Sequence, residues 1–231
     1  MASPSGFERG LDHGFDLDAL PLRERKKIQT GIRLWRTAVT LFAERGFDQV
    51  SVAEIAAAAD VSKMTVFNYF PTKEDLVMGP MEQHIDEPAR VVRERAPGSS
   101  AVEALRAHYL AALAVFDPST GLSDDRVVLD VVRVIHQTPT LLVRATAGFD
   151  RKSQTLLAAE LLAQDPDHDE FTAKVAAAQL LAAQLTLTAD NQRRMLAGER
   201  AEDALPAALD AAHRAFAMVE RGLGDYGAGT A

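Results

Sequence analysis

The sequence predicts an all-α protein, on three observations. Apolar residues recur at the three- to four-residue spacing of amphipathic helices, and Ser or Thr residues stand where they would cap helix N-termini. No run alternates apolar and polar residues between turn signals, as a half-buried strand would. Apolar residues make up 47% of the 231 residues and charged residues 25%, which is the balance of a globular protein with its own core.

The first residues predict a mobile arm. Residues 1–20 are polar, contain three glycines and lack a helical period, so we expect an N-terminal arm over residues 1–24. Acidic residues stand where a secretory signal needs a basic start and an apolar run, and no stretch approaches 18 apolar residues. We therefore expect a cytoplasmic protein that does not enter membranes. The absence of cysteine fits a reducing compartment and excludes disulfides and thiolate metal sites.

The first helix is predicted from Thr30 onward. Trp35, Val39 and Phe42 belong to its apolar stripe, and Gly46 ends it in the position after the last helical residue.

Two short helices follow. Ser51 and Glu54 form the capping box that opens the second helix, and Asp60 lies at the tight turn that ends it. Ser62 then caps a third helix over residues 63–70, which a following proline ends.

The remainder of the chain is predicted to be helical. Thr72 caps a fourth helix with Asp75 at its third position. Residues 127–136 are apolar nearly all round and are expected to form a buried helix. Small residues and a final apolar stripe predict two closely packed helices at about residues 170–196 and 203–222.

The charge distribution separates the N-terminal part from the rest. Residues 21–78 hold nine Lys or Arg and seven Asp or Glu, a net charge of +2, whereas the whole chain carries −8. This partition is expected if only the first part meets phosphates. Two short helices joined by a tight turn and buttressed by a longer one predict a helix-turn-helix, whose second helix enters the major groove of DNA.

Several side chains of this segment suit phosphates. Lys63 and Lys73 stand in the first turns of their helices, where the macrodipole disfavours a cation and a nearby phosphate would reverse that penalty. The hydroxyls of Ser51, Ser62 and Thr72 stand at helix N-termini, which bind anions readily. The same three residues would also be good N-caps without DNA.

Two segments carry a family pattern, residues 53–76 (AEIAAAADVSKMTVFNYFPTKEDL) and residues 38–47 (AVTLFAERGF). Together they resemble the DNA-binding domain of the tetracycline-repressor (TetR) family. Asp60 departs from the glycine that the family often has at the turn, but Asp tolerates a left-handed backbone better than most residues. The resemblance implies a three-helix DNA-binding domain at residues 25–78 and a larger helical ligand-binding and dimerisation domain at residues 79–231.

The resemblance also assigns residues to DNA by position. Phe67 and Tyr69 could equally belong to the protein core, because helical spacing puts their neighbours Val66 and Phe70 on the buried face. The basic cluster at residues 23–27 would be either a solvated arm or a contact to nearby phosphates or the minor groove. The implied contacts are Lys63, Met64 and Thr65 to base edges, Thr30, Ser51, Tyr69 and Lys73 to phosphates, and Phe67 to a thymine methyl group or the sugar backbone.

Polar residues in the second half of the chain suggest a ligand site. Arg133, His136 and Arg144 lie in apolar stretches and could orient a ligand in a cavity. The favoured alternative is that they pair with Asp130 or face solvent. Residues 138–144 are similar to an actinobacterial subgroup of the family with an acyl-CoA-like ligand domain.

The sequence contains few signs of a metal site, a cofactor site or a catalytic site. No two of the six histidines stand three or four residues apart, and the acidic loop at residues 165–169 lacks the glycine and the final glutamate of a calcium loop. No glycine-rich phosphate loop or nucleophile elbow occurs. We therefore expect neither a cofactor nor a catalytic residue.

The sequence thus predicts a ligand-responsive transcriptional regulator, specifically a repressor. We expect a homodimer that binds a near-palindromic operator, and a small, largely apolar effector that enters among the helices of about residues 101–164. The alternative is a helical small-molecule-binding protein or enzyme with a vestigial DNA-binding domain. Lys63, Tyr69 and Lys73 favour the regulator.

Overall fold

The computed structural model describes residues 21–82, 84–165 and 169–223, and within these ranges it contains helices and turns but no strand. The chain divides into two compact units. Unit 1 contains the described residues up to Glu82 together with Asp125–Ala145, and unit 2 contains the described residues from 84 to Asp124 and from Thr146 onward. Residues 125–145 were expected in the C-terminal domain, whereas they cluster with the N-terminal helices.

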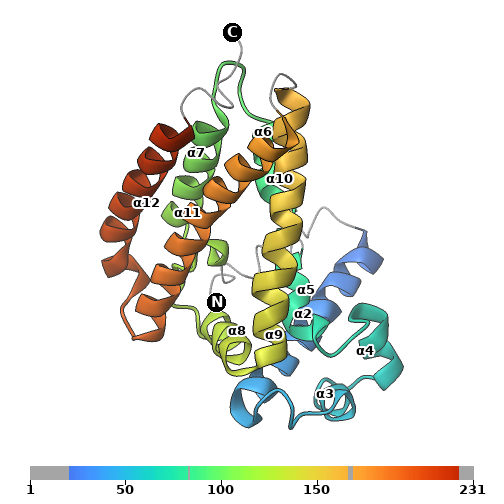
Figure 1. The fold of residues 1–231 in the computed structure, drawn as a ribbon. Helices are drawn as coiled ribbons and strands as arrows, with labels where there is room; N and C mark the ends of the chain where they lie inside the picture. Colours follow the sequence, from blue (N-terminus) through green and yellow to red (C-terminus); the bar gives the residue numbers. More distant parts are fainter. Residues whose placement is uncertain (1–20, 83, 166–168, 224–231) are drawn as a thin grey trace. The chain divides into compact units, whose positions relative to one another are not determined.

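Unit 1 is built around one long helix. Helix α2 packs against α3, α5 and α8, and α3 packs against α4. Trp35 and Phe42 of α2, Ile55 of α3, Val66 of α4 and Leu76 of α5 are almost fully buried and form its core. The helices are α2 (Leu22–Arg45), α3 (Val52–Ala58), α4 (Lys63–Tyr69), α5 (Asp75–Glu82), α8 (Arg126–Gln137) and α9 (Pro139–Val143) (Figure 1).

The start of α2 differs from the prediction. The helix begins at Leu22 rather than at Thr30, so residues 22–24 of the predicted arm are helical, and residues 1–20 lie outside the described residues. The residues between Arg23 and Gln29 are mostly good helix formers, but they lack the apolar stripe that reveals a helix in a sequence. The C-terminal end is as predicted, because Gly46 follows the last helical residue with a φ of +88°.

The local signals between α2 and α5 are confirmed. Ser51 and Glu54 form the reciprocal capping box of α3, and the Ser62 hydroxyl accepts a hydrogen bond from the backbone of Thr65. Asp60 adopts the left-handed conformation, with a φ of +53°. Helix α4 ends where Phe70 becomes extended before its proline.

Helix α8 is only partly buried, which corrects the expectation of a helix enclosed on all sides. Val128, Val131 and Val134 are buried, whereas Arg126 and Arg133 are exposed. The polar residues of this helix recur with its own period, so that one side faces solvent and the other packs against α2.

Unit 2 is a helical bundle. Helices α7, α11 and α12 lie side by side in Figure 1, and α10 packs against α6 and α11. The last two helices agree closely with the predicted ranges. The elements are α6 (Glu87–Arg93), α7 (Ala101–Ala114), the short 3-10 turn η2 (Pro118–Thr120), the π-helical turn η3 (Arg144–Phe149) that leads into this unit from unit 1, α10 (Asp150–Gln164), α11 (Glu170–Leu196) and α12 (Ala201–Leu223).

A buried polar network fixes η2 to the bundle. The amide of Asn191 donates to the Thr120 carbonyl oxygen at 2.9 Å, and the Tyr109 hydroxyl donates to the same oxygen at 3.3 Å. Burial raises the pKa of Tyr109 to about 12. Gly121 follows with a φ of +74°, and a Cβ placed there would lie 2.4 Å from the backbone oxygen of Thr188. The backbones of η2 and α11 therefore approach closely only because residue 121 is glycine.

A second polar cluster stands at the start of α6. Nδ1 of His84 lies 3.2 Å from one carboxylate oxygen of Glu87, and Nε2 of His108 lies 3.5 Å from the other. The hydrogen bond to Glu87 raises the pKa of His84 despite partial burial. Burial opposes ionisation of Glu87, but its two histidine partners outweigh this effect and lower its pKa.

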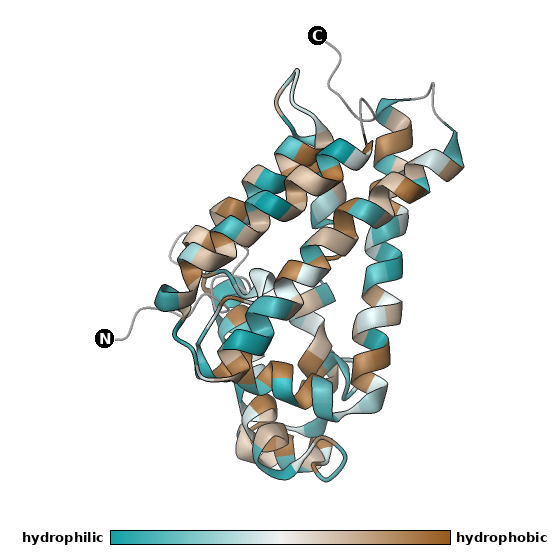
Figure 2. Ribbon diagram, turned by 60° about the vertical axis from the view of Figure 1, so that its left-hand side comes forward, coloured by the Kyte–Doolittle hydropathy of each residue, from teal (hydrophilic) through white to brown (hydrophobic). Residues whose placement is uncertain are grey.

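Hydrophilic and hydrophobic residues alternate along the helices in Figure 2. Among the described residues, no helix is both long enough and apolar enough to span a bilayer.

Candidate nucleic-acid interface

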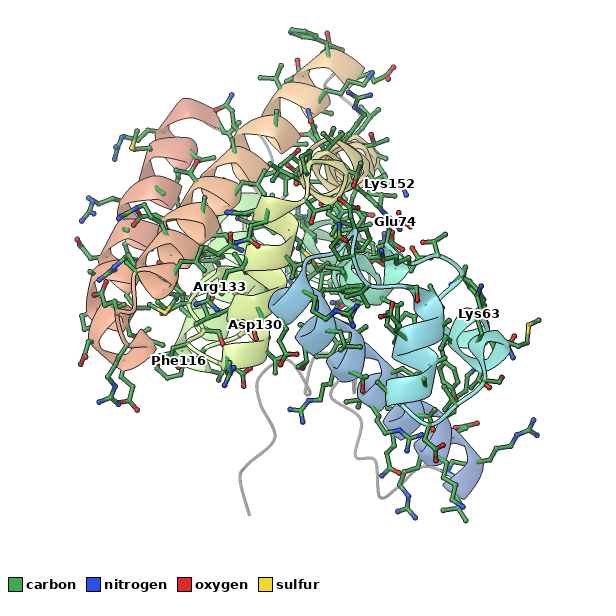
Figure 3. All side chains as sticks on the ribbon, turned by 90° about the horizontal axis from the view of Figure 1, so that it is seen from below. Lys63, Glu74, Phe116, Asp130, Arg133 and Lys152 are labelled. Carbon is green, nitrogen blue, oxygen red and sulfur yellow. The ribbon has the colours of Figure 1, made fainter. Side chains whose placement is uncertain are left out.

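Helix α4 presents most of its side chains to solvent. Val66 is completely buried and anchors the helix, whereas Met64 is 68% exposed and Phe67 is 37% exposed. Lys63 is also exposed and lies on the outer side of the helix (Figure 3). A seven-residue helix cannot stabilise itself, so its exposed apolar side chains are held outward by the packing of Val66 behind them.

The exposed residues of α4 interact with each other. The Nζ of Lys63 lies 5.7 Å from the ring centroid of Phe67, one helical turn away, which is a cation–π distance. The Thr65 hydroxyl lies 2.8 Å from the hydroxyl of Ser62 at the N-terminus of the helix. The outer face of α4 therefore combines a cation, an aromatic ring, a thioether and hydroxyl groups, which suits the edges of base pairs and their thymine methyl groups.

Lys73 is held by aromatic rings. Its Nζ lies 4.3 Å from the ring centroid of Phe47 and 5.7 Å from that of Phe42. These two rings pack together with their centroids 4.9 Å apart. In the sequence, the position of this lysine indicated phosphate binding alone; its contact with the two rings is a second reason for a cation at this place.

Tyr69 connects α4 with α2. A Cβ placed on Gly31 would lie 3.4 Å from Cδ1 of the Tyr69 ring, so this ring rests against α2 where that helix has no side chain. The residue is partly buried, which leaves room for both interpretations made from the sequence, a core position and a phosphate contact.

The predicted phosphate-binding hydroxyls of Ser51 and Thr30 have partners within the chain. The Ser51 hydroxyl donates to the Glu54 carboxylate at 2.8 Å, and this carboxylate also accepts from Arg45 at 2.6 Å. The backbone N–H of Ser51 and the Arg45 guanidinium lower the pKa of Glu54 to about 2. The Thr30 hydroxyl donates to the carbonyl oxygen of Lys26 at 2.8 Å. Each hydroxyl therefore already donates its proton within the chain, and it keeps a lone pair that can accept a further hydrogen bond.

The structure gives different surroundings to the three residues that the sequence assigned to a ligand site, Arg133, His136 and Arg144. Arg133 donates to Asp130 at 2.9 Å, as the favoured alternative predicted, and the two residues lie together in Figure 3. His136 is exposed near the end of α8. The assignment of these three residues to a ligand stays a prediction.

Arg144 has partners that sequence reasoning missed. Its guanidinium donates to Oδ1 of Asp75 at 2.6 Å and to Oε1 of Glu82 at 2.5 Å. Burial opposes ionisation of Asp75, but the Thr72 hydroxyl and Arg144 outweigh it and lower the pKa of Asp75. Asp75 also accepts from the backbone N–H of Thr72 at 2.8 Å, so the arginine stabilises the cap at the start of α5. A lone arginine in an apolar tract was the one signal in the sequence, but it did not identify partners 62 and 69 residues away.

No group of three or more His, Cys, Asp or Glu side chains in the described ranges is arranged to hold a metal ion.

Comparisons with known proteins agree with this geometry. Residues 34–78 match the family model described as "Bacterial regulatory proteins, tetR family". The chain is 31% identical over 137 residues to the HTH-type transcriptional regulator TcmR of Streptomyces glaucescens, an alignment that covers 58% of each protein. It is 44% identical over 64 residues to the HTH-type transcriptional regulator LuxR of Vibrio harveyi, covering 26% of this chain and 31% of that protein. The alignments thus span about a third to three fifths of these relatives.

Two solved structures share the fold over most of the chain. Salmonella enterica GusR aligns with a TM-score of 0.54 and 22% identity, covering 85% of this chain and 95% of that one. NalD of Pseudomonas aeruginosa, described as the secondary repressor of the MexAB-OprM multidrug efflux pump, aligns with a TM-score of 0.54 and 18% identity, covering 82% and 96%.

Proposed function

We propose that this chain is a ligand-responsive transcriptional regulator of the tetR family that represses by binding operator DNA; the match of residues 34–78 to the family model supports this. The observation that carries this proposal is the outer face of α4, where Lys63, Met64 and Phe67 are exposed on a helix that the buried Val66 holds in place. An exposed apolar and cationic helix face is costly in water and suits the major groove.

We assign the contacts by their place in unit 1. Lys63, Met64 and Thr65 meet base edges from the N-terminal half of α4, and Phe67 meets a thymine methyl group or a sugar. Thr30, Ser51, Lys73 and, at the end of α4, Tyr69 meet phosphates.

The regulator acts as a homodimer on a near-palindromic operator, because one short recognition helix reads too few bases to be selective. Helices α11 and α12 form the dimer contact. Exposed apolar side chains on them support this assignment, since Val175 and Leu185 of α11 and Met218 of α12 are 38%, 44% and 66% exposed. A protein that binds chromosomal DNA works in the cytoplasm.

The effector is a small, largely apolar molecule that enters among the helices of about residues 101–164, whose apolar side chains include Leu105, Leu113 and Leu157. It lowers DNA affinity by preferring a conformation that binds the operator poorly.

Selection of bound sequences from random duplex DNA, followed by gel-shift titration, tests the proposal. The full-length protein is expected to enrich an inverted repeat. Lys63→Ala is expected to cost on the order of 1–3 kcal/mol at one position of each half-site and to relax the base preference there. Lys73→Ala is expected to weaken binding to all duplexes alike. Failure to enrich any sequence above background would refute the proposal.

A further inference from the structure

Arg144 binds both ends of α5 with one guanidinium group. Its Nη2 donates to Oδ1 of Asp75 at 2.6 Å and to Oε1 of Glu82 at 2.5 Å, and all three residues belong to unit 1. Asp75 is the first residue of α5 and Glu82 is the last. The side chain of Asp75 is only 16% exposed, so water and salt screen its bond to Arg144 less than they screen a fully exposed ion pair.

Asp75 passes this constraint to the turn that precedes α5. Its second oxygen, Oδ2, accepts from the backbone N–H of Thr72 at 2.8 Å, and its own backbone N–H donates to the Thr72 hydroxyl at 3.2 Å. The two oxygens of one carboxylate are thus divided between Arg144 and Thr72. Because both oxygens accept charge-assisted hydrogen bonds, the carboxylate and the backbone of Thr72 are held in one arrangement.

Lys73 follows Thr72 directly and depends on the same turn. Its carbonyl oxygen accepts from the backbone N–H of Leu76 at 3.2 Å, and the side chain of Leu76 is completely buried. Its Nζ lies 4.3 Å from the ring centroid of Phe47. The position of this ammonium group therefore depends on two things, the rings that confine its end and the capped turn that carries its backbone.

The backbone also departs from regular helix at Arg144. This residue is the first of the π-helical turn η3. Turns of this kind are rare and frequently occur at functional sites. The irregular backbone at Arg144 is therefore a second observation, independent of its ion pairs, that marks this position as more than a surface arginine.

We propose that Arg144 is a positioning residue for DNA binding, which acts through Asp75 and Thr72 to hold Lys73 where it meets a phosphate. This inference rests on the proposed function. Arg144 acts from within unit 1 and does not itself contact DNA. Because the contact that it supports is to a phosphate, it contributes affinity for every duplex alike and not for particular bases.

The test uses two variants of the ion pair and one matched control. Arg144→Gln removes the guanidinium. Asp75→Asn keeps one acceptor oxygen, which cannot serve Arg144 and Thr72 together, and it raises the net charge of the protein by one. Arg126→Gln is the control, because it removes one positive charge from an exposed pair with Asp130 in the same unit. Circular dichroism verifies that each variant is folded at the temperature of the assay.

Fluorescence anisotropy without added effector measures affinity for the selected operator and for a random duplex, between about 50 and 200 mM salt. Arg144→Gln is expected to weaken both complexes by about three- to tenfold and to reduce the slope of log K against log salt by up to about 0.9, the value of one phosphate contact. Asp75→Asn is expected to weaken both by about threefold, although a gain of positive charge alone would strengthen them. Arg126→Gln is expected to match the parent within about twofold.

A double-mutant cycle separates positioning from a general structural role. In a Lys73→Ala background, Arg144→Gln is expected to change DNA affinity by less than about twofold, because the lysine through which it acts is absent. A residue that merely supports the fold would give the same loss in both backgrounds.

Three results would overturn the inference. These are parent-like affinity in Arg144→Gln, tighter binding in Asp75→Asn, and losses from Arg144→Gln and Lys73→Ala that add in the double variant. A loss that Arg126→Gln shares would overturn it too, because net charge alone would then explain the result. Failure of the proposed function looks different, since the parent itself would then enrich no sequence.

Discussion

Replacing Gly121 with alanine is expected to destabilise unit 2 strongly. The new Cβ would lie 2.4 Å from the backbone oxygen of Thr188 and 2.9 Å from Cγ of Gln192, and a backbone atom cannot move aside as a side chain can. Residue 121 also has a φ of +74°, where an L-residue other than glycine costs about 1–2 kcal/mol. To relieve the clash, η2 must move away from α11.

The movement of η2 would break the buried hydrogen bonds that Asn191 and Tyr109 donate to the Thr120 carbonyl, and each contributes about 1 kcal/mol. The expected total loss is roughly 3–4 kcal/mol, which lowers the melting temperature of a chain of this size by about 10 °C. Thermal unfolding followed by circular dichroism measures this shift.

Gly98→Ala is the matched control. Gly98 has a similar φ of +80°, but a Cβ there would meet no atom within 4 Å, so this variant reports the left-handed strain alone. Its melting temperature is expected to fall by only a few degrees, for a loss of about 1–2 kcal/mol. Equal losses in the two variants would refute the argument, since the close approach of η2 and α11 would then contribute nothing.

Four further predictions can be tested. The carboxylate of Glu87 raises the pKa of His84 above its usual 6.5, so the stabilisation is complete below that value and is lost as the pH rises through the raised pKa. Urea unfolding between pH 5.5 and 8.5 is expected to show this decline in the parent and a flatter profile in His84→Gln, and identical profiles would contradict it. Arg144→Gln leaves two carboxylates of α5 without their partner and is expected to cost about 1–2 kcal/mol of stability by the same assay, after allowance for their partial exposure. If Arg133, His136 and Arg144 orient the effector, single replacements will weaken the inducer response in a reporter strain, and three normal responses would remove that assignment. Sedimentation at micromolar concentration is expected to give a dimer, and a folded monomer would exclude the proposed use of α11 and α12.

Local chemistry made much of unit 1 predictable. The caps at Ser51 and Ser62 and the left-handed turn at Asp60 depend on residues at most a few positions apart, so the sequence shows them directly. The outward face of α4 was only partly predictable: Val66 was expected in the core, but Phe67, which is 37% exposed, fitted the core equally well from the sequence.

Features that depend on distant contacts were not predictable. The first turns of α2 have no apolar stripe, and their helical state follows from propensity and continuity with the packed part of the helix. The partners of Arg144 lie 62 and 69 residues away, and the contact of Lys73 with Phe42 and Phe47 likewise forms only in the folded chain.

The ammonium group of Lys73 has aromatic partners within the folded chain itself. A lysine side chain in water samples many rotamers, and confining it costs up to about 2 kcal/mol of entropy. In this protein the rings of Phe47 and Phe42 confine it when unit 1 folds. If Lys73 binds a phosphate as proposed, its charge is already in place, and binding loses less rotamer entropy than it would with a freely moving lysine. Two aromatic side chains of α2 and its following turn thus determine where a positive charge stands on the protein surface.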